Sequence, residues 1–493
     1  MANESKGPKK HHQLYKFFPL AAIPGIFLFH NLNYFRELLF YSEVYWLMAG
    51  YLLLPFVFYF LFSSILNRPI EQSIIVAALT ALFFFFFGAL QDFFLQHSIT
   101  KIIGKTYILP LFFLIPAVYV LKRRPNTTAW LRSLHFTLLF FLLSECFLLI
   151  WNLPDFSQVP LLNKSETLKQ VKVERQDKLN IHHIVFDGYT NTATLKKLFN
   201  FKNPLDSFLL KEGFFIAGRT KSNYNFTPYS LAATLNMQYL ELNNKQLVRD
   251  FKNYLWGAKV YQQNSVFRFF ESQQYSTSYY AVLDNNKHLD KLGTFVPKTP
   301  HYSMRYQTLE RIVMNPWLWH KVAGASKEMI PPAVKASLRY YVQYNQQALN
   351  HALQPEPAPH FRFTHFLLPH EPYVFSKSSV DSLLLSDLMD HNKGYIKQVE
   401  YANGLIKKLI TELKKNSRNI IILQGDHGFR NYDHSRHSPY TQNETLNTFY
   451  FPDQNYRFLY DSISPVNTYR LLLSQYFHHN LPLLKDSAIV PRE

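Results

Sequence analysis

"NIIILQGDHG" (419–428) joins an uninterrupted apolar run to an acid, a histidine and a glycine. The apolar run is short and rich in β-branched residues, which favours a parallel strand buried on both faces. In open α/β sheets, ligands bind just outside the carboxyl ends of such strands. Asp426 and His427 therefore stand where a site is expected. A turn without chemistry at the end of a strand is the alternative.

Two other apolar runs end in residues of the same kinds. "NIHHIVFDGY" (180–189) reaches Asp187 and a glycine, and "FRFTHFLLPHEPY" (361–373) reaches His370. Strands that alternate with helices predict a mainly parallel sheet covered by helices on both faces. The acids and histidines are then expected at corresponding ends of three strands. The helical patterns between the strands are at 331–353 and 395–415.

Residues 1–154 are far more apolar than the rest of the chain. Several of their apolar stretches are long enough to cross a hydrocarbon core of roughly 30 Å. A buried helical domain of a soluble protein is the alternative, and it is disfavoured because the stretches follow one another with only short polar joints. Five membrane helices are predicted, at about 17–33, 43–66, 72–91, 106–121 and 129–151.

The basic residues between these stretches predict the orientation of the chain, because cytoplasmic joints carry an excess of Lys and Arg. The N-terminal tail, the second joint and the fourth joint hold nine, whereas the first and third joints hold three. With five crossings and a cytoplasmic N-terminus, everything after about residue 152 lies outside the membrane. The first apolar run has no small-residue cleavage site after it, which predicts an uncleaved anchor. We therefore expect a multi-pass protein of the inner or plasma membrane.

The pattern predicts three parts: a transmembrane domain (1–154), a linker or amphipathic helix (155–178) and an extracytoplasmic domain (179–493). The formal net charge is +18, and a basic domain beside a bilayer favours anionic lipid or phosphate substrates. An extracytoplasmic location argues against nucleic acid as a partner. Cys146, the single cysteine, falls in the fifth stretch, so an intrachain disulfide is excluded.

"SNYNFTPYSLAATLNMQYL" (222–240) begins polar and continues as a helix. Thr227 followed by Pro228 is typical of a helix start, because threonine caps free N–H groups and proline is tolerated in the first turn. A hydroxyl at this place also faces free N–H groups and the positive end of the helix dipole, which suit a phosphate. Thr227 is therefore either a plain helix cap or a nucleophile.

Four motifs in this order resemble the sulfatase-like branch of the alkaline phosphatase superfamily: "HHIVFDGY", "SNYNFTPYSLAATLNM", "FLLPHEPY" and "IIILQGDHG". The resemblance covers residues 179–493, and "LNTFYFPDQNY" with "LYDSISPVNTYRLLLSQYF" looks like the closing strands and helix of that group. Five spans before such a domain are similar to the plan of lipoteichoic acid synthases and lipid A phosphoethanolamine transferases. The implied fold is a five-helix transmembrane bundle followed by an α/β/α sandwich with a mainly parallel sheet.

Carried over position by position, the resemblance implies Thr227 as the nucleophile and places His370 against the substrate phosphate. Carboxylate oxygens and an imidazole suit Zn²⁺ or Mn²⁺, and a metal lowers the pKa of a bound hydroxyl so that it can attack. The implied metal ligands are Asp187, Thr227, Asp426 and His427.

Other polar residues are weaker candidates. Arg430 lies just past the metal pair and would neutralise a phosphate, although an ordinary surface arginine explains it equally well. Three histidines are candidates for a second metal, for protonation of the leaving group or for substrate binding, whereas histidines in polar loops are often merely solvated. They are His365, His434 and His437. Substrate binding is predicted for His365, Arg430 and His437.

Two departures limit what the resemblance implies. Sulfatases need Cys or Ser in a C/S-x-P-x-R motif, whereas this chain has Thr227 with Tyr229 and Leu231 at the corresponding places, so sulfate-ester hydrolysis is not expected. Asp187 stands where the two transferase families usually carry a glutamate, and phosphatases and phosphodiesterases also use the shorter carboxylate. The subfamily and the substrate therefore stay open.

The preferred hypothesis is a transferase that passes a phosphorylated head group from a membrane phospholipid to an envelope glycan or lipid. Thr227 would attack the donor phosphodiester, diacylglycerol would leave, and the phospho-threonine intermediate would be discharged onto an acceptor hydroxyl. An extracytoplasmic phosphatase or phosphodiesterase would use the same nucleophile and metal with water as acceptor. A non-catalytic membrane partner is the third hypothesis, and the intact set of one Thr, two Asp and one His argues against it.

Overall fold

The structure is a computed structural model, and the chain in it divides into two compact units. The first consists of Met1–Ser157 and Lys298–Ser326, and the second of Gln158–Pro297 and Lys327–Glu493. The linker predicted at 155–178 lies, except for its last residue, outside the described residues. Described are residues 15–34, 42–65, 67–96, 109–123, 126–151, 178–240, 247, 251–283, 300–311, 329–330, 332–432 and 435–491.

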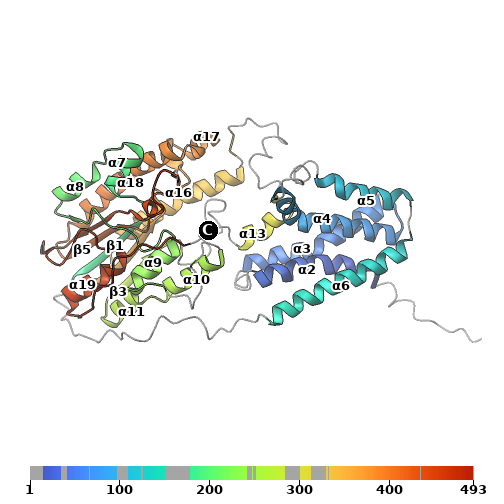
Figure 1. Ribbon diagram of the computed structural model, residues 1–493, viewed down its shortest axis with the longest axis horizontal. Helices are drawn as coiled ribbons and strands as arrows, with labels where there is room; N and C mark the ends of the chain where they lie inside the picture. The colour runs from blue at the N-terminus through green and yellow to red at the C-terminus, as the bar shows by residue number, and fades with distance from the viewer. Residues whose placement is uncertain are drawn as a thin grey trace, which may run out of the picture. The chain divides into compact units, whose positions relative to one another are not determined.

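In the first unit, the described residues form five apolar helices that lie together as a bundle (Figure 1). Three stretches are long and apolar enough to cross a membrane: Tyr45–Ile65, Ile70–Phe94 and Thr127–Trp151. The α2 and α5 helices are shorter, with 17 and 15 residues, so five crossings stay a prediction. The helices are α2 (Phe18–Tyr34), α3 (Ser42–Phe60), α4 (Ile70–Gln96), α5 (Leu109–Arg123) and α6 (Thr127–Trp151).

The central helix of the bundle is α4, of whose span 56% is buried inside the structure, against 6% for α6. Small buried side chains, such as Ala77 and Ala81, let neighbouring helices approach α4. On α6, by contrast, Phe136 and Phe140 are exposed by 69% and 68%. Exposed apolar side chains of this kind suit contact with lipid, which agrees with the membrane helix predicted there.

The first unit also contains a segment from the C-terminal half of the chain. The α13 helix (Pro300–Gln307) and the residues up to Arg311 are contiguous in sequence with strands and helices of the second unit, yet they pack against α4. The sequence prediction placed this segment in the exported domain, 179–493. Its packing against α4 had no signal in the sequence pattern.

The second unit is built on a six-stranded mixed sheet in the order β2-β6-β5-β1-β4-β3. Neighbours among β5, β1, β4 and β3 are parallel, and β6 is antiparallel to both β5 and β2. Every residue of β1, β4 and β5 is buried, as expected for strands covered on both faces. The strands are β1 (Asn180–Phe186), β2 (Phe215–Ile216), β3 (Ser276–Tyr280), β4 (His360–Phe366), β5 (Asn419–Gly425) and β6 (Asn447–Tyr450).

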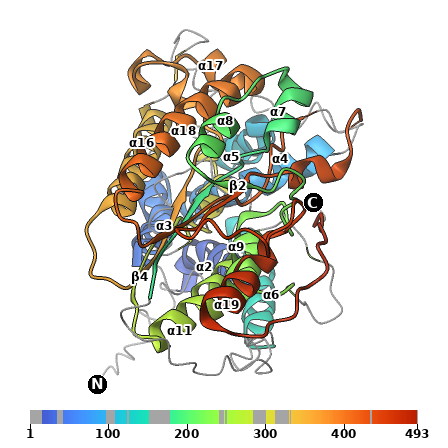
Figure 2. The same cartoon turned by 90° about the vertical axis from the view of Figure 1, so that its left-hand side faces the viewer.

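Helices lie on the two faces of this sheet (Figures 1 and 2). The first group is α7 (Thr192–Phe199), α8 (Leu205–Lys211), α16 (Pro332–Leu353), α17 (Leu385–Met389) and α18 (His391–Leu413). The second group, on the other side in Figure 1, is α9 (Thr227–Asn236), α10 (Phe251–Gln262), α11 (Ser265–Ser272) and α19 (Thr468–Phe477). Figure 2 shows the same side for α9, α11 and α19. The helical patterns at 331–353 and 395–415 correspond to α16 and α18.

The register of the three central strands brings their carboxyl ends level. Phe186 of β1 pairs with Phe366 of β4 on one side and with Gly425 of β5 on the other. The residues that follow these three positions therefore begin their loops at one edge of the sheet. Gly425 is required there, because a Cβ would lie 2.3 Å from Thr445 Oγ1 and 2.6 Å from the Tyr189 carbonyl oxygen.

Candidate active site

The loops after β1 and β4 are joined at the edge of the sheet by backbone hydrogen bonds. The Asp187 N–H donates to the Phe366 carbonyl at 2.9 Å, and the His370 N–H donates to the Asp187 carbonyl at 3.0 Å. Both bonds of the Asp187 backbone thus go to the same segment, the end of β4 and the loop after it. This fixes the direction of the Asp187 side chain relative to His370.

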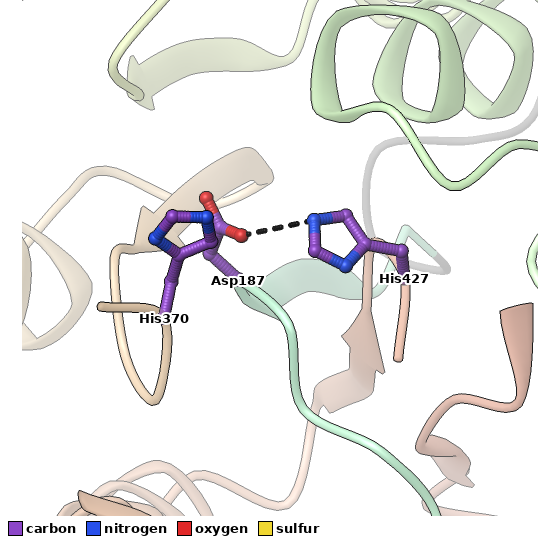
Figure 3. Close-up of side chains that lie close together, drawn as sticks. All are labelled: Asp187, His370 and His427. Atoms are coloured by element: carbon purple, nitrogen blue, oxygen red, sulfur yellow. Dashed lines mark ion pairs between the residues drawn. The ribbon is translucent and has the colours of Figure 1, made fainter. Parts of the chain in front are cut away.

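Asp187, His370 and His427 come together at this edge (Figure 3). One potential ligand atom from each lies within 4.8 Å of the others. His427 Nε2 and Asp187 Oδ1 lie 3.3 Å apart. Asp187 and His427 are buried and His370 is half-buried, so the cluster opens toward the outside on the His370 side.

Asp426 and His365 form a second group with the same Asp187, again with ligand atoms within 4.8 Å of one another. His365 Nε2 lies 3.7 Å from Asp187 Oδ2, and His427 Nε2 lies 3.6 Å from Asp426 Oδ2. His365 belongs to β4 and is fully buried. That place favours a metal-ligand role for His365 over the substrate-binding role that the sequence predicted.

Two of these side chains use one polar atom for orientation and leave another free. Asp426 Oδ1 accepts hydrogen bonds from the Gly188 N–H at 2.9 Å and from the His427 N–H at 2.8 Å. His427 Nδ1 donates to the Gly428 carbonyl at 2.7 Å, which leaves the Nε2 lone pair available. Such outer hydrogen bonds are what orients metal ligands in proteins.

The remaining atoms of the cluster are buried and form no hydrogen bond with the residues that the structure describes. A buried polar atom without a partner costs about 1–3 kcal/mol, so several of them around one point need a common partner. Carboxylate oxygens and imidazole nitrogens fit a divalent cation. The atoms are Asp187 Oδ1, Asp426 Oδ2, His427 Nε2 and both ring nitrogens of His365.

The electrostatics of the cluster keep its ligands in the forms that a cation requires. Burial by itself would raise the pKa of the Asp187 carboxyl, but the nearby His370, His427 and His365 outweigh it and hold that pKa below its ordinary value. Burial lowers the pKa of the His365 imidazole, although the carboxylates of Asp187 and Asp426 oppose this. An ionised carboxylate beside a neutral imidazole is the protonation state in which both bind metal.

Thr227 is the first residue of α9, and the structure does not use it as the helix cap. The N-cap is Phe226, with φ −129° and ψ 116°, and its side chain makes no capping bond. Thr227 is buried, and among the described residues its hydroxyl has no hydrogen-bond partner. Ser230, in the same turn, donates its hydroxyl to the Asp426 carbonyl at 2.6 Å, so the start of α9 is attached to the loop of the metal candidates.

A small pocket contains Thr227 together with Asp187, His370 and Arg430. His370 Nδ1 donates to the Glu371 carbonyl at 2.7 Å, and Arg430 Nη2 donates to His370 Nε2 at 2.6 Å. Arg430 therefore lies in the pocket and is not an ordinary surface arginine. Its guanidinium supplies a fixed positive charge to the pocket that Thr227 also lines, which suits an anionic phosphate.

The sequence missed most of the walls of this pocket. Glu371 lines it and follows His370 directly in "PHEPY", so its position beside a candidate residue was the available signal. The other walls are apolar or aromatic and come from segments far apart in sequence, for which no local signal exists. They are Phe226, Tyr254, Val282, Tyr341 and Leu367.

One of the predicted histidines, His437, is not brought into the site. His437 packs its ring on Tyr432, with centroids 5.9 Å apart, and does not line this pocket or the neighbouring one that contains His427 and Arg430. His434 lies outside the described residues.

Helices α16 and α18 hold the loop that carries His370. Gln398 of α18 donates its side-chain amide to the His370 carbonyl at 2.8 Å and accepts the Val374 N–H at 3.0 Å. Tyr341 of α16 donates to the same His370 carbonyl at 2.6 Å. Tyr395 of α18 donates to the Gly188 carbonyl at 2.7 Å and so supports the loop after Asp187 as well. Both loops of the site are therefore held by hydrogen bonds from α16 and α18, which lie on the same face of the sheet.

No protein-family model matches the chain, and no curated protein matches it. Matching solved structures include lipooligosaccharide phosphoethanolamine transferase A (EptA) of Neisseria meningitidis, an integral membrane protein, with 11% identity, 96% of both chains covered and a TM-score of 0.39. The zinc complex of the periplasmic domain of EptC from Escherichia coli has 13% identity, covers 65% of this chain and 86% of that domain, and gives a TM-score of 0.36.

The phosphonate monoester hydrolase of Agrobacterium radiobacter also matches, with 13% identity, 61% of this chain, 74% of that chain and a TM-score of 0.35. Matching structures further include a protein of the alkaline phosphatase superfamily from Vibrio parahaemolyticus. By their names, these structures include phosphoethanolamine transferases and a member of the alkaline phosphatase superfamily, the groups that the sequence motifs resemble. Identities and TM-scores this low assign no activity to the chain, and its function is inferred from the site.

Proposed function

We propose that the protein is a metal-dependent enzyme that transfers a phosphorylated head group from a membrane phospholipid to an envelope glycan or lipid. The observation that carries this proposal is the meeting of three features. Buried ligand atoms and a threonine hydroxyl have no hydrogen-bond partner among the described residues, and an arginine lines the same pocket as the threonine. A metal cluster alone would serve a structural role. The hydroxyl and the cation in the same pocket support phosphoryl transfer.

The metal ligands in this proposal are Asp187, Asp426, His427 and the Thr227 hydroxyl, with His365 as a further ligand. The donor set fits, because the free atoms are hard oxygens and imidazole nitrogens, as Zn²⁺ and Mn²⁺ prefer. When bound, the metal supplies Lewis acidity that lowers the pKa of a coordinated hydroxyl.

In the first step, Thr227 Oγ forms a bond to phosphorus and loses its proton, while the bond from phosphorus to the diacylglycerol oxygen breaks. That oxygen takes up a proton as it leaves. Arg430 faces the non-bridging phosphate oxygens, which carry negative charge throughout the step. His370 Nδ1–H is held by the Glu371 carbonyl, so its Nε2 lone pair accepts from Arg430 and orients the guanidinium toward the phosphate.

In the second step, a hydroxyl oxygen of the acceptor attacks phosphorus and the bond to Thr227 Oγ breaks. The acceptor loses its proton and Thr227 regains one, so the enzyme returns to its starting state. An alcohol of an envelope glycan or lipid makes the protein a transferase, whereas water makes it a phosphodiesterase. The apolar first unit supports the membrane donor, because the scissile phosphate of a phospholipid lies at the bilayer surface.

Incubation of the purified full-length protein with phospholipid vesicles tests the proposal. The phospholipid carries its label in the head group, and envelope lipid and glycan are supplied as acceptors. Mass spectrometry of the Thr227 peptide should show an adduct with the mass of the phosphorylated head group. Labelled acceptor identifies a transferase, and free head group identifies the hydrolase. An unmodified peptide, with no released diacylglycerol and no stoichiometric metal, would favour a non-catalytic membrane partner.

A further inference from the structure

The chain leaves the second unit after Pro297, and residues Lys298–Ser326 belong to the first unit before the chain returns. The described part of this excursion is α13 and the residues up to Arg311. The segment thus interrupts the sequence of the second unit but packs with the helices of the first unit. Its contacts with α4 are specific.

The first contact is backbone on backbone. A Cβ on Gly88 of α4 would lie 2.7 Å from the Gln307 Cα and 2.7 Å from its carbonyl oxygen, so only glycine allows this approach. The Leu309 N–H donates to the Phe84 carbonyl, one helical turn earlier on α4, at 2.7 Å. The end of α13 therefore lies directly on the α4 backbone.

The second contact is a nearly buried cation. The Arg311 side chain is 8% exposed, and its Nη2 donates to both carboxylate oxygens of Asp92 at 2.8 Å. Its Nη1 donates to the Gly88 carbonyl at 3.0 Å and to Gln91 Oε1 at 3.1 Å. The Tyr306 ring lies 4.1 Å from the guanidinium carbon. These four hydrogen bonds pair both terminal nitrogens of the guanidinium, whereas its Nε has no hydrogen-bond partner among the described residues. A buried charge is retained where it is paired in this way, so the geometry specifies one docked position.

The third contact reaches α3. Tyr51 of α3 donates its hydroxyl to Glu310 at 2.7 Å, and Glu310 also pairs with Arg305 at 2.5 Å. The segment therefore binds α3 through the acid Glu310 and α4 through the base Arg311. Packing in this form resembles a protein interface with two charged anchor points.

We infer that residues 300–311 form an anchor segment through which the catalytic chain binds the C-terminal end of α4. The anchor segment adds two chain connections between the units, before Lys298 and after Ser326, to the one after Ser157. It thereby restrains a catalytic domain that a single linker would leave free to turn.

The functional consequence rests on the proposed function. A phospholipid phosphate stays at the bilayer surface, so a catalytic domain with three chain connections to a membrane-embedded bundle would meet it at a higher effective concentration than a domain on a single linker. A soluble phosphodiester reaches the site from any direction and does not depend on the restraint. Loss of the anchor segment should therefore affect lipid substrates selectively.

Cross-linking tests the docking without any assay of activity. Because Cys146 is the only cysteine, a Cys146→Ser background carrying Phe84→Cys and Leu309→Cys has one cysteine pair, and a short bismaleimide should join it. A matched pair of Phe140→Cys and Leu309→Cys uses an outward position of α6 and should stay unjoined. Arg311→Met in the first background should lower the yield several-fold. Absence of the 84–309 product, or equal yields from both pairs, overturns the docking.

Turnover tests the restraint. Arg311→Met should slow release from labelled phospholipid in vesicles about tenfold and leave a water-soluble nitrophenyl phosphodiester within about twofold. Gly88→Ala is a second variant that loosens the docking without removing charge, and Arg339→Met, which breaks an exposed ion pair on α16, is the control. Equal losses on both substrates overturn the restraint. If the unmodified protein turns over neither substrate, the proposed function fails, and the restraint with it, while the cross-link still decides the docking.

Discussion

Thr227→Ala separates a nucleophile from a residue that only supports the fold. The N-cap of α9 is Phe226, and the Thr227 hydroxyl has no hydrogen-bond partner among the described residues, so the alanine variant loses no capping bond. It loses one buried methyl group, about 0.8 kcal/mol, and gains up to about 0.7 kcal/mol from the higher helix propensity of alanine. The free energy of unfolding should therefore change by less than about 1 kcal/mol.

Turnover should respond very differently, because the covalent route needs the Thr227 oxygen. We expect Thr227→Ala to lower turnover of labelled phospholipid by about 10³-fold or more, by analogy with removal of a nucleophile in other enzymes. Metal content should be retained, since Asp187, Asp426 and His427 are unchanged. Thr227→Ser keeps the hydroxyl and should retain measurable turnover. Thermal unfolding, metal analysis and release of diacylglycerol are the three measurements.

Thr234→Ala is the matched control, because Thr234 is a buried threonine of the same helix whose hydroxyl donates to the Ser230 carbonyl at 2.8 Å. It should cost about 1 kcal/mol of stability and leave turnover per folded molecule unchanged. The reasoning is refuted if Thr227→Ala is folded, binds metal and still turns over phospholipid at a rate close to that of the unmodified protein.

Three further predictions follow from the site and its surroundings. Removal of divalent metal with a chelator should abolish turnover and lower the unfolding temperature. Readdition of metal at about 1,000 times its dissociation constant should restore about 4 kcal/mol to the free energy of unfolding. An unfolding temperature that does not change on metal removal would contradict the metal site. Arg430→Met should raise KM about 10- to 100-fold. Arg430→Lys should have a smaller effect, because lysine keeps the positive charge but loses the bidentate hydrogen bonding of the guanidinium. Equal KM values in both variants and the unmodified protein would show that Arg430 does not bind substrate. Burial lowers the pKa of His183 to about 3, so its unfolded form binds a proton below about pH 6.5 while the folded form does not. Stability should be complete above that pH and fall by about 1.4 kcal/mol per unit as the pH drops toward 3, with a shallower slope in His183→Gln measured by denaturant unfolding; an identical slope in the two proteins would contradict the burial of a neutral His183.

Local pattern was enough to predict the elements that carry the site. The apolar runs that end at Asp187 and Asp426 are buried strands, and α16 and α18 occupy the two predicted helical stretches. A strand buried on both faces has no polar positions until it ends, so the first acid after it marks the edge of the sheet. That is why Asp187, His370 and the pair Asp426/His427 could be expected at one place without knowledge of the fold.

Tertiary structure alone decided which other residues join them. His365 and His437 both looked like loop histidines, yet His365 is buried on β4 beside two carboxylates and His437 packs on Tyr432. The packing of Arg311 against α4 likewise depends on two segments that are far apart in sequence. The residues that hydrogen-bond across this contact are 219 to 223 positions apart. Hydrophobic periodicity reports the burial of a residue by its own element, whereas these positions depend on which distant element arrives beside them.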